Sequence, residues 1–387
     1  SYCFPLMSAG TANSPNALLW AESGRLIDFN LSSGAPVPNA DVNERAVKVT
    51  DVDGHPQWRL KREDNTMELY AAAGALTSRT TSDGKAVTYG YSTASTPPSI
   101  APTAGLLIAQ TDSFGRVLSF QYNSAGLMTQ MTDPDGQAYA YFYDTAGAEC
   151  AVGNCNRVVR VQFPDQFTRQ YLYNEPGSIG ATTPPSPPLL TGINEIWPAI
   201  SGSPSKTVRV GTYGYDASGN AILTQQANGW GQYAVTSRSS GSVTITDPLN
   251  SQRTTIFQKL FGAIYPNNNS QPAGSGCFAS TSTLTYDANG NLASADDFNA
   301  HRTCYVSDLT RNLETTRVEG LPNTQACNTV TPPNATLPAS SRKTSTQWHP
   351  DWRLAIKVAE PGKLTTSVYH GQPDPFNASA IASCAPA

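Results

Sequence analysis

The sequence predicts an all-β protein in which antiparallel hairpin repeats form one curved or spiralling sheet. Three observations lead to this prediction: glycines recur about every ten residues, aromatic and apolar residues alternate between them, and the composition favours turns. The 387 residues include 30 Gly and 29 Pro, and only 14% are charged. Such a composition is typical of strands that reverse often.

The turns set the length of the strands. From Thr111 the chain reads TDSFGRVLSFQYNSAGLMTQMTDPDGQAYAYFYDTAGAE, and its glycines at 115, 126, 136 and 147 each follow an Asp or Asn by three residues. Asp and Asn favour the first position of a type I turn, and Gly at the fourth tolerates a positive φ. The chain therefore reverses at each of these glycines.

Between the turns, side chains alternate with the period of two that a strand requires. One turn, strand, turn and strand together span about 21 residues, and related segments lie at 82–92, 170–177, 210–220 and 284–291. A single hairpin cannot bury its apolar face, so neighbouring hairpins must stack. The alternating sets are Leu118, Phe120 and Tyr122, and Tyr139, Tyr141 and Tyr143.

Four regions follow from this pattern. Residues 1–75 are an irregular β region, and 76–320 carry the repeats with a long loop insertion at 174–207, where ATTPPSPPLL is rich in Pro. Residues 321–345 contain VTPPNATLP and are predicted to be a Pro-rich loop. Residues 346–387 are expected to be further repeat strands that continue the sheet.

A Tyr-x-Tyr-Asp-x-x-Gly motif occurs as YFYDTAG (141–147) and YGYDASG (213–219), and in shortened form as LTYDANG (284–290). With the segments 297–320 and 345–375, this pattern resembles the rearrangement-hotspot (RHS) or YD-repeat family of bacterial secreted proteins. The repeat-motif residues are Tyr122, Gly126, Tyr143, Asp144, Gly147, Tyr215, Asp216, Gly219, Tyr286, Asp287 and Gly290.

The resemblance implies a β strip wound into a hollow shell or barrel, which in toxin relatives encloses a C-terminal toxic domain and in teneurin-like relatives forms an adhesive surface. The chain has too few repeats for a typical shell, so we expect a piece of a larger secreted protein or a relative that closes differently. Toxin relatives also carry a self-cleavage motif. DPDGQ (133–137) and DPLN (247–250) match only its turn part, so no self-cleaving site is carried over.

The leading functional hypothesis is a non-enzymatic structural segment that encloses or presents a toxin or effector domain outside this chain. Its expected partners are the remaining repeats or the toxin domain of a longer protein, and identical chains joined through strand edges or a disulfide. We expect no cofactor and no metal. One alternative is an extracellular adhesin or self-assembling filament, and a carbohydrate-active enzyme is a third.

Charge and hydropathy exclude other partners. The chain has 25 Lys and Arg against 29 Asp and Glu, with no basic block, so nucleic acid is a poor partner. The sequence has no apolar run of about 18 residues, so it does not predict membrane insertion. The opening SYCFPLMSAG lacks the features of a signal peptide, which leaves room for a start upstream.

Seven cysteines lie at 3, 150, 155, 277, 304, 327 and 384, without the paired spacing of a zinc site. They favour an extracellular or cell-surface location with up to three disulfides over free buried thiols. The best pairing is Cys150 with Cys155, and the second is Cys304 with Cys327. The odd cysteine could be free, pair outside this chain, or join two chains.

One polar stretch invites a calcium-binding interpretation. Asp287, Asn289 and Asn291 have the spacing of the first ligands of an EF-hand, but Leu292 and Phe298 occupy the places of its Gly and Glu. A hairpin turn is therefore favoured here, and also at Asp51 and Asp53 before Gly54.

Catalytic interpretations are weaker still. His55, His301, His349 and His370 each lie near a carboxylate, but no nucleophile motif accompanies them. His349 is expected to pack beside Trp348 and Trp352. The pairs Asp296 and Asp297, and Glu63 and Asp64, are adjacent on strands and point to opposite faces, so neither fits a glycosidase. The tyrosine rows could stack on sugars, but more often such rows fill one layer of a sheet.

Overall fold

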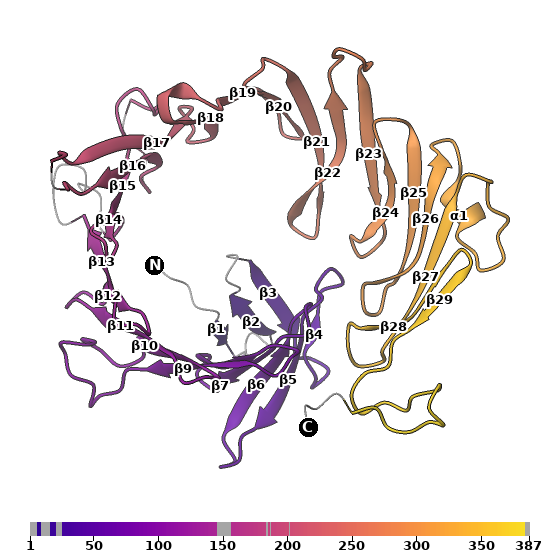
Figure 1. Cartoon of the computed structure of the whole chain (residues 1–387), viewed down its shortest axis with the longest axis horizontal. Coiled ribbons are helices and arrows are strands. Elements are labelled where there is room, and N and C mark those ends of the chain that lie inside the picture. The colour runs from indigo at the N-terminus through magenta and orange to yellow at the C-terminus, as the bar shows by residue number, and fades with distance from the viewer. Residues whose placement is uncertain are drawn as a thin grey trace.

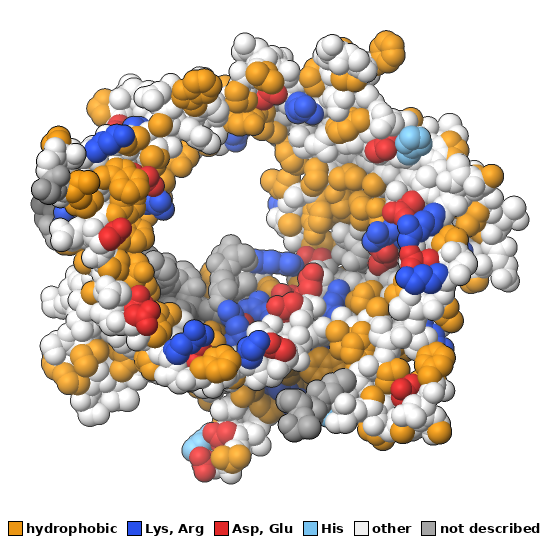
Figure 2. Space-filling view, viewed as in Figure 1, with side chains coloured by type: hydrophobic (Ala, Val, Ile, Leu, Met, Phe, Trp, Pro, Cys, Tyr) orange, Lys and Arg blue, Asp and Glu red, His pale blue; other side chains and the backbone are white. Residues whose placement is uncertain are grey.

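The computed structural model describes residues 6–8, 16–20, 25–144, 156–182, 185, 187–200 and 202–383. These residues form a small sheet of four strands and a large antiparallel sheet of 25 strands. The large sheet curves into a ring (Figure 1), and an open hole passes through its centre (Figure 2). The fold class predicted from the sequence is confirmed.

The small sheet contains β1 (Leu6–Ser8), β2 (Asn16–Trp20), β3 (Leu26–Asn30) and β4 (Val37–Pro38). The large sheet contains β5 (Arg45–Thr50), β6 (Pro56–Lys61), β7 (Met67–Ala71), β8 (Leu76–Thr80), β9 (Ala86–Tyr91), β10 (Leu107–Asp112), β11 (Val117–Tyr122), β12 (Met128–Thr132), β13 (Ala138–Tyr143), β14 (Val158–Gln162), β15 (Thr168–Tyr173), β16 (Leu190–Trp197), β17 (Lys206–Tyr215), β18 (Ala221–Gln226), β19 (Tyr233–Arg238), β20 (Ser242–Thr246), β21 (Gln252–Leu260), β22 (Ala263–Gln271), β23 (Ser280–Tyr286), β24 (Leu292–Asp296), β25 (His301–Asp308), β26 (Leu313–Pro322), β27 (Arg342–Trp348), β28 (Ala355–Glu360) and β29 (Lys363–Thr366). A 3₁₀ turn (η2, Ala227–Gly229) and one short helix, α1 (Cys327–Val330), lie in connections.

The hairpin turns use the chemistry that the sequence predicts. After β23, the carbonyl of Asp287 accepts the N–H of Gly290 at 3.1 Å. The Asp287 carboxylate accepts the N–H groups of Asn289 at 2.9 Å and Asn291 at 3.0 Å. Gly290 has a φ of 82°, in the left-handed region that disfavours a side chain. A carboxylate that binds its own turn holds the reversal in place.

Each repeat tyrosine fastens neighbouring strands together. The hydroxyl of Tyr122 donates to the carbonyl of Leu107 at 2.6 Å, and that of Tyr143 donates to Met128 at 2.8 Å. Leu107 and Met128 are the first residues of the preceding strands. Tyr215 and Tyr286 make equivalent bonds, to Leu190 at 2.8 Å and Pro266 at 2.7 Å. The tyrosine row therefore bonds the sheet to itself.

The small sheet covers one arc of the ring. It lies inside the ring against β5–β9 (Figure 1), where Leu19 and Phe29 share a buried core with Trp58, Leu60 and Tyr70. Burial of each such side chain stabilises the fold by roughly 1.5–3 kcal/mol. This is the main apolar core among the described residues, and it fixes the N-terminal strands on the inner wall.

The predicted region boundaries need correction. Within 1–75, β5–β7 already belong to the large sheet, and only β1–β4 stand apart. The insertion 174–207 holds a full strand, β16, paired with β15 and β17. Its alternation was hidden because Pro-rich segments surround it. The loop 321–345 contains α1 and the start of β27, and after β29 the described chain to residue 383 forms turns and no further strand of the sheet.

The ring has a break in its strand ladder. Every strand from β5 to β29 pairs with the next along the chain, but no backbone pairing joins β29 to β5 among the described residues. The sheet is therefore not closed as a hydrogen-bonded barrel. The same described part of the chain contains no helix of the length and apolarity that crossing a membrane requires.

Candidate functional site

The two ends of the sheet meet through their connections. Because successive strands are antiparallel neighbours, connections after odd-numbered strands lie on one rim of the ring, and those after even-numbered strands lie on the other. We call these the odd rim and the even rim. The even rim of β5–β7 contacts the odd rim of β25–β28, and we call this contact the seam.

Asn65 and Arg353 form the central pair of the seam. The Asn65 side chain accepts the backbone N–H of Arg353 at 2.8 Å and donates to the carbonyl of Arg353 at 3.3 Å. This amide therefore replaces a strand-to-strand bridge. Asn65 is buried and has a φ of 67°, a conformation that Asn tolerates better than most residues.

Two arginines extend the seam on the odd rim. Arg353 donates to the carbonyls of Arg311 at 2.7 Å and Asn312 at 3.0 Å. Arg311 donates to the carbonyls of His349 at 2.7 Å and Trp352 at 2.9 Å. These bonds join the β25–β26 connection to the β27–β28 connection. The two connections thus meet the even rim together.

The polar stretch after Tyr286 supports the seam. Asn289 donates to the Asn312 side-chain oxygen at 2.8 Å, and Asn291 donates to the same oxygen at 3.1 Å. Asn312 in turn donates to the carbonyl of Ala40 at 2.8 Å, across the seam. The hairpin interpretation of this stretch therefore holds in the structure, and its amides have a second role that the sequence analysis missed.

The cations of the seam bind carbonyl oxygens and an aromatic ring. Lys61 lies over the Trp352 ring, 3.7 Å from its centroid, and contacts the carbonyl of Asp351. Arg45 donates to the carbonyl of Thr310 at 3.1 Å. Burial lowers the pKa of Arg45, and the positive charge of Arg353 lowers it further. The seam therefore concentrates positive charge where the ends of the sheet meet.

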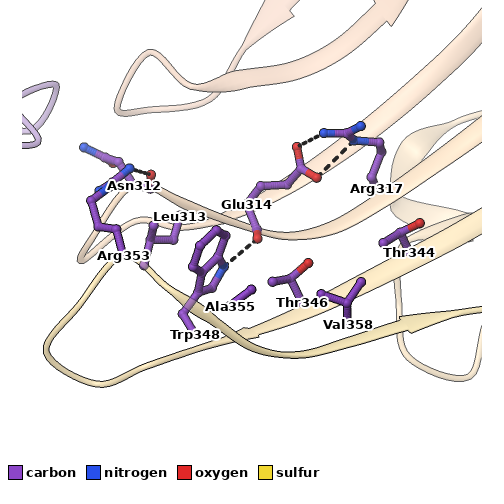
Figure 3. Close-up of a pocket in the computed structure, with 10 residues that line it drawn as sticks. All are labelled: Asn312, Leu313, Glu314, Arg317, Thr344, Thr346, Trp348, Arg353, Ala355 and Val358. Atoms are coloured by element: carbon purple, nitrogen blue, oxygen red, sulfur yellow. Dashed lines mark hydrogen bonds and ion pairs between the residues drawn. The ribbon is translucent and has the colours of Figure 1, made fainter. Parts of the chain in front are cut away.

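A pocket of about 440 Å³ lies beside the seam on β26–β28 (Figure 3). The Trp348 indole N–H donates to the carbonyl of Glu314 at 2.8 Å, and Glu314 pairs with Arg317 through two contacts of 3.0 Å. Thr344, Thr346, Ala355 and Val358 complete one wall.

Alternation shows which side of the sheet this pocket faces. Cys304 and Val318 pack against Val330 of α1, and α1 lies outside the ring (Figure 1). Tyr305 and Arg317, their neighbours in sequence, pair with each other and therefore point to the opposite face, the concave one. The pocket is thus part of the wall of the central hole.

The structure joins Cys304 and Cys327 in a disulfide with a Cα–Cα distance of 5.4 Å. This pairing was the second choice from the sequence. Cys277 is free and exposed. Cys150 and Cys155, the first choice, lie outside the described residues, as do Gly147, Cys3 and Cys384. The disulfide ties the β26–β27 connection to the outer wall.

The histidines lie mostly in turns. His55 Nδ1 is 3.2 Å from Asp51, and His301 Nδ1 is 3.4 Å from Asp297. The ligand atoms of Asp51, Asp53 and His55 lie within 4.8 Å of one another, but Asp51 also accepts the N–H groups of Asp53 and His55, as a turn residue does. His349 Nδ1 accepts the N–H groups of Asp351 at 3.0 Å and Trp352 at 3.2 Å, so it holds a turn through hydrogen bonds, and its packing beside Trp348 and Trp352 stays a prediction.

The paired carboxylates bind separate partners. Asp296 pairs with Arg302 at 2.7 Å, whereas Asp297 accepts the N–H of His301 at 2.8 Å. Glu63 accepts from Asn43 at 3.0 Å, and Asp64 accepts the N–H of Thr66 at 2.9 Å. Neither pair converges on a common point.

Glu68 is a buried residue that the sequence analysis missed. Its carboxylate is fully buried and accepts from Tyr70 at 2.7 Å, Arg62 at 2.8 Å and Arg79 at 2.9 Å. Burial works against the charged form of Arg62, but the adjacent Glu68 outweighs it and raises the pKa of Arg62. Burial, together with the Glu68 charge, raises the pKa of Tyr70. The sequence did contain a sign of this buried carboxylate, because Glu68 shares the core-facing side of its alternating strand with Tyr70.

Comparison with known family models identifies one segment of the ring. Residues 103–138 match the family model described as RHS Repeat. The chain contains an RHS repeat. The RHS resemblance predicted from the tyrosine and glycine pattern is confirmed in this segment, which covers β10, β11, β12 and the first residue of β13. A search of curated proteins found no match to this RHS chain.

Solved structures similar to the RHS chain include toxin complexes. A crystal structure of TcdB2-TccC3 without its hypervariable C-terminal region is 11% identical, with a TM-score of 0.40, over 89% of this chain and 20% of that one. The Tc holotoxin pore of Photorhabdus luminescens is 12% identical, with a TM-score of 0.37, over 92% of this chain and 22% of that one. A porin-like protein from Bacteroides uniformis has a TM-score of 0.20. The RHS chain spans about one fifth of the length of the first two.

Proposed function

We propose that this RHS chain is a non-enzymatic wall segment of a secreted protein, and that its hollow ring encloses or presents a toxin or effector domain that lies outside this chain. The observation that carries the proposal is the seam. The ends of the sheet are held around the central hole by side chains, chiefly Asn65 and Arg353, in place of a strand ladder. Such a wall surrounds space without filling it with its own core.

The inner wall supports this proposal. Beside the seam, the concave face carries the pocket with Trp348 and the Glu314–Arg317 pair. An aromatic ring beside a paired charge suits contact with a polypeptide, because both apolar and polar groups can be matched there. An extracellular location accords with the Cys304–Cys327 disulfide, since disulfides persist in oxidising compartments.

Protease protection tests the proposal. The protein is isolated as its cell makes it, with any sequence that flanks this chain, and is treated with trypsin under native conditions. We expect a flanking domain to resist digestion in the wild type and to be digested in the double variant Asn65→Gly, Arg353→Ala, which loosens the seam. Circular dichroism confirms that the variant keeps its strands.

Two results would overturn enclosure. One is a flanking domain that is cut as fast in the assembled protein as when it is expressed alone. The other is a mature protein that contains no polypeptide beyond this chain. The same preparation, assayed on polysaccharides, is expected to release no sugar, and release of sugar would contradict the non-enzymatic part of the proposal.

A second candidate is an adhesin or filament whose copies are linked by a disulfide. The exposed thiol of Cys277 favours it. In that case the mass of the secreted protein without reductant is a multiple of its mass with reductant. The Cys277→Ser variant then has the mass of a single chain in both conditions.

A further inference from the structure

The even rim carries a row of exposed apolar side chains beyond the seam. Phe114, Trp230, Leu249 and Phe278 occupy four of its connections and are 71%, 75%, 86% and 94% exposed. Trp197, the last residue of β16, and Ile200, in the β16–β17 connection, are exposed as well. Five of the seven even-rim connections from β10 to β23 therefore present an exposed large apolar group.

Half-buried aromatic rings in edge-on and tilted contact lead to Trp197 along the same rim. Tyr139 contacts Phe163 with centroids 5.7 Å apart, Phe163 contacts Phe167 at 5.3 Å, and Phe167 contacts Trp197 at 4.8 Å. The rings belong to β13, to the β14–β15 connection and to the last residue of β16, so the contacts follow the even rim from β13 to β16. Exposed apolar surface of this extent marks an interaction site, because water solvates it poorly.

The seam indicates which kind of surface binds the even rim. At β5–β7 the even rim is already covered, and its partner there is the odd rim of β25–β28 of the same chain. The apolar row continues that same rim from β10 onward. The odd rim outside its seam segment also offers exposed apolar groups, at Val52 and Phe261.

We propose that the even rim from β10 to β23 is an interface that receives the odd rim of a second copy of this chain. The contact is head-to-tail, so each copy leaves one rim open, and a third copy can add in the same way. This interface lies on the rim and is independent of what the central hole holds.

A lipid surface is the less favoured partner. The same connections carry the carboxylates of Asp112, Asp133, Asp165 and Asp247, each at or next to the turn. Their negative charge opposes an anionic membrane. The chain as a whole has a formal net charge of −4.

Sedimentation velocity of the 387-residue chain tests the proposal. We expect a mass that rises with concentration from 41.1 kDa toward its multiples, in the presence of reductant. The triple variant Phe114→Ser, Leu249→Ser, Phe278→Ser should shift the concentration for assembly upward by tenfold or more, because it removes three large apolar side chains that the interface would bury. All three are exposed at connections, so folding should be unchanged in circular dichroism.

Val306→Ser is the matched control. Val306 is an exposed apolar residue within β25, away from both rims, so its replacement should leave assembly unchanged. A chain that stays monomeric at every concentration overturns the proposal. So does equal assembly of the wild type and the triple variant, or binding to vesicles of phosphatidylcholine and phosphatidylserine without self-association.

Discussion

The side chain of Asn65 bonds to both the N–H and the carbonyl of Arg353, at 2.8 and 3.3 Å, and so joins residues 288 positions apart in the chain. At the seam, the side-chain amide of Asn65 thus makes the backbone hydrogen bonds that a neighbouring strand makes elsewhere in the sheet. The Asn65 side chain is buried, so the loss of this amide or of its partner leaves a polar group without a hydrogen bond.

Replacing Asn65 should loosen the seam. Asn65→Gly removes the amide and keeps the positive φ that Gly tolerates. We expect amide hydrogens of residues 349–354 to exchange about tenfold faster, which corresponds to about 1.4 kcal/mol. Asn250→Gly is the control, since Asn250 also has a positive φ, of 61°, but lies in the β20–β21 connection. Equal exchange in both variants would show that the amide does not hold the seam.

Removing the charge of Glu68 should destabilise the N-terminal strands. Glu68→Gln leaves Arg62 and Arg79 in place without their buried counter-ion. We expect a loss of about 3–5 kcal/mol in the free energy of unfolding, measured with urea. The exposed Glu63→Gln should change it by about 0.5 kcal/mol or less. A similar effect of both substitutions would contradict a structural role for this network.

Breaking the Cys304–Cys327 disulfide should lower stability by about 3 kcal/mol, because the bridge closes a loop with a sequence separation of 23. The double variant Cys304→Ala, Cys327→Ala is compared with the wild type by thermal unfolding, with and without reductant. Reductant should lower the melting temperature of the wild type but not that of the variant. A wild type that is insensitive to reductant would argue against the bridge in solution.

The repeat tyrosines should contribute similar and additive amounts. Tyr143→Phe and Tyr286→Phe each remove one hydroxyl bonded to a strand carbonyl, and each should cost about 1 kcal/mol. The two sites are far apart in the sheet, so the double variant should lose the sum. Tyr233→Phe, at an exposed ring, serves as the control. No loss in the double variant would mean that water replaces these bonds without cost.

Alkaline pH should unfold the ring through Tyr91, Tyr122 and Tyr286. Burial raises the pKa of Tyr91 to about 12, with Tyr89 and Tyr122 adding to the effect, and burial also raises the pKa of Tyr122 and Tyr286. A raised folded-state pKa means that the unfolded chain releases protons first, at a pH of about 10. Stability is therefore complete below about pH 10 and falls as pH rises toward 12.

Circular dichroism, followed together with tyrosinate absorbance, checks this dependence. We expect loss of strand signal and ionisation to occur together above pH 10, and the Tyr91→Phe variant to resist slightly higher pH. Ionisation that is complete before any strand is lost would contradict the prediction.

Much of the local structure was predictable because the responsible groups lie close in sequence. Asp287 and Gly290 hold their own turn, and Tyr143 bonds a residue 15 positions away. Alternation likewise marks strands and their two faces without knowledge of their neighbours. Where Pro-rich flanks masked the alternation, as around β16, the same reasoning failed.

The sequence by itself determined the all-β class, the hairpin order and the RHS pattern, since these depend on turn chemistry and on side-chain period. Only the tertiary structure decided where the sheet ends meet, that Asn289 and Asn291 support Asn312, and that Glu68 lies between two arginines. Curvature is the physical reason. Small twists between neighbouring strands add up over the whole sheet, and their sum brings Asn65 to Arg353, which no local pattern records.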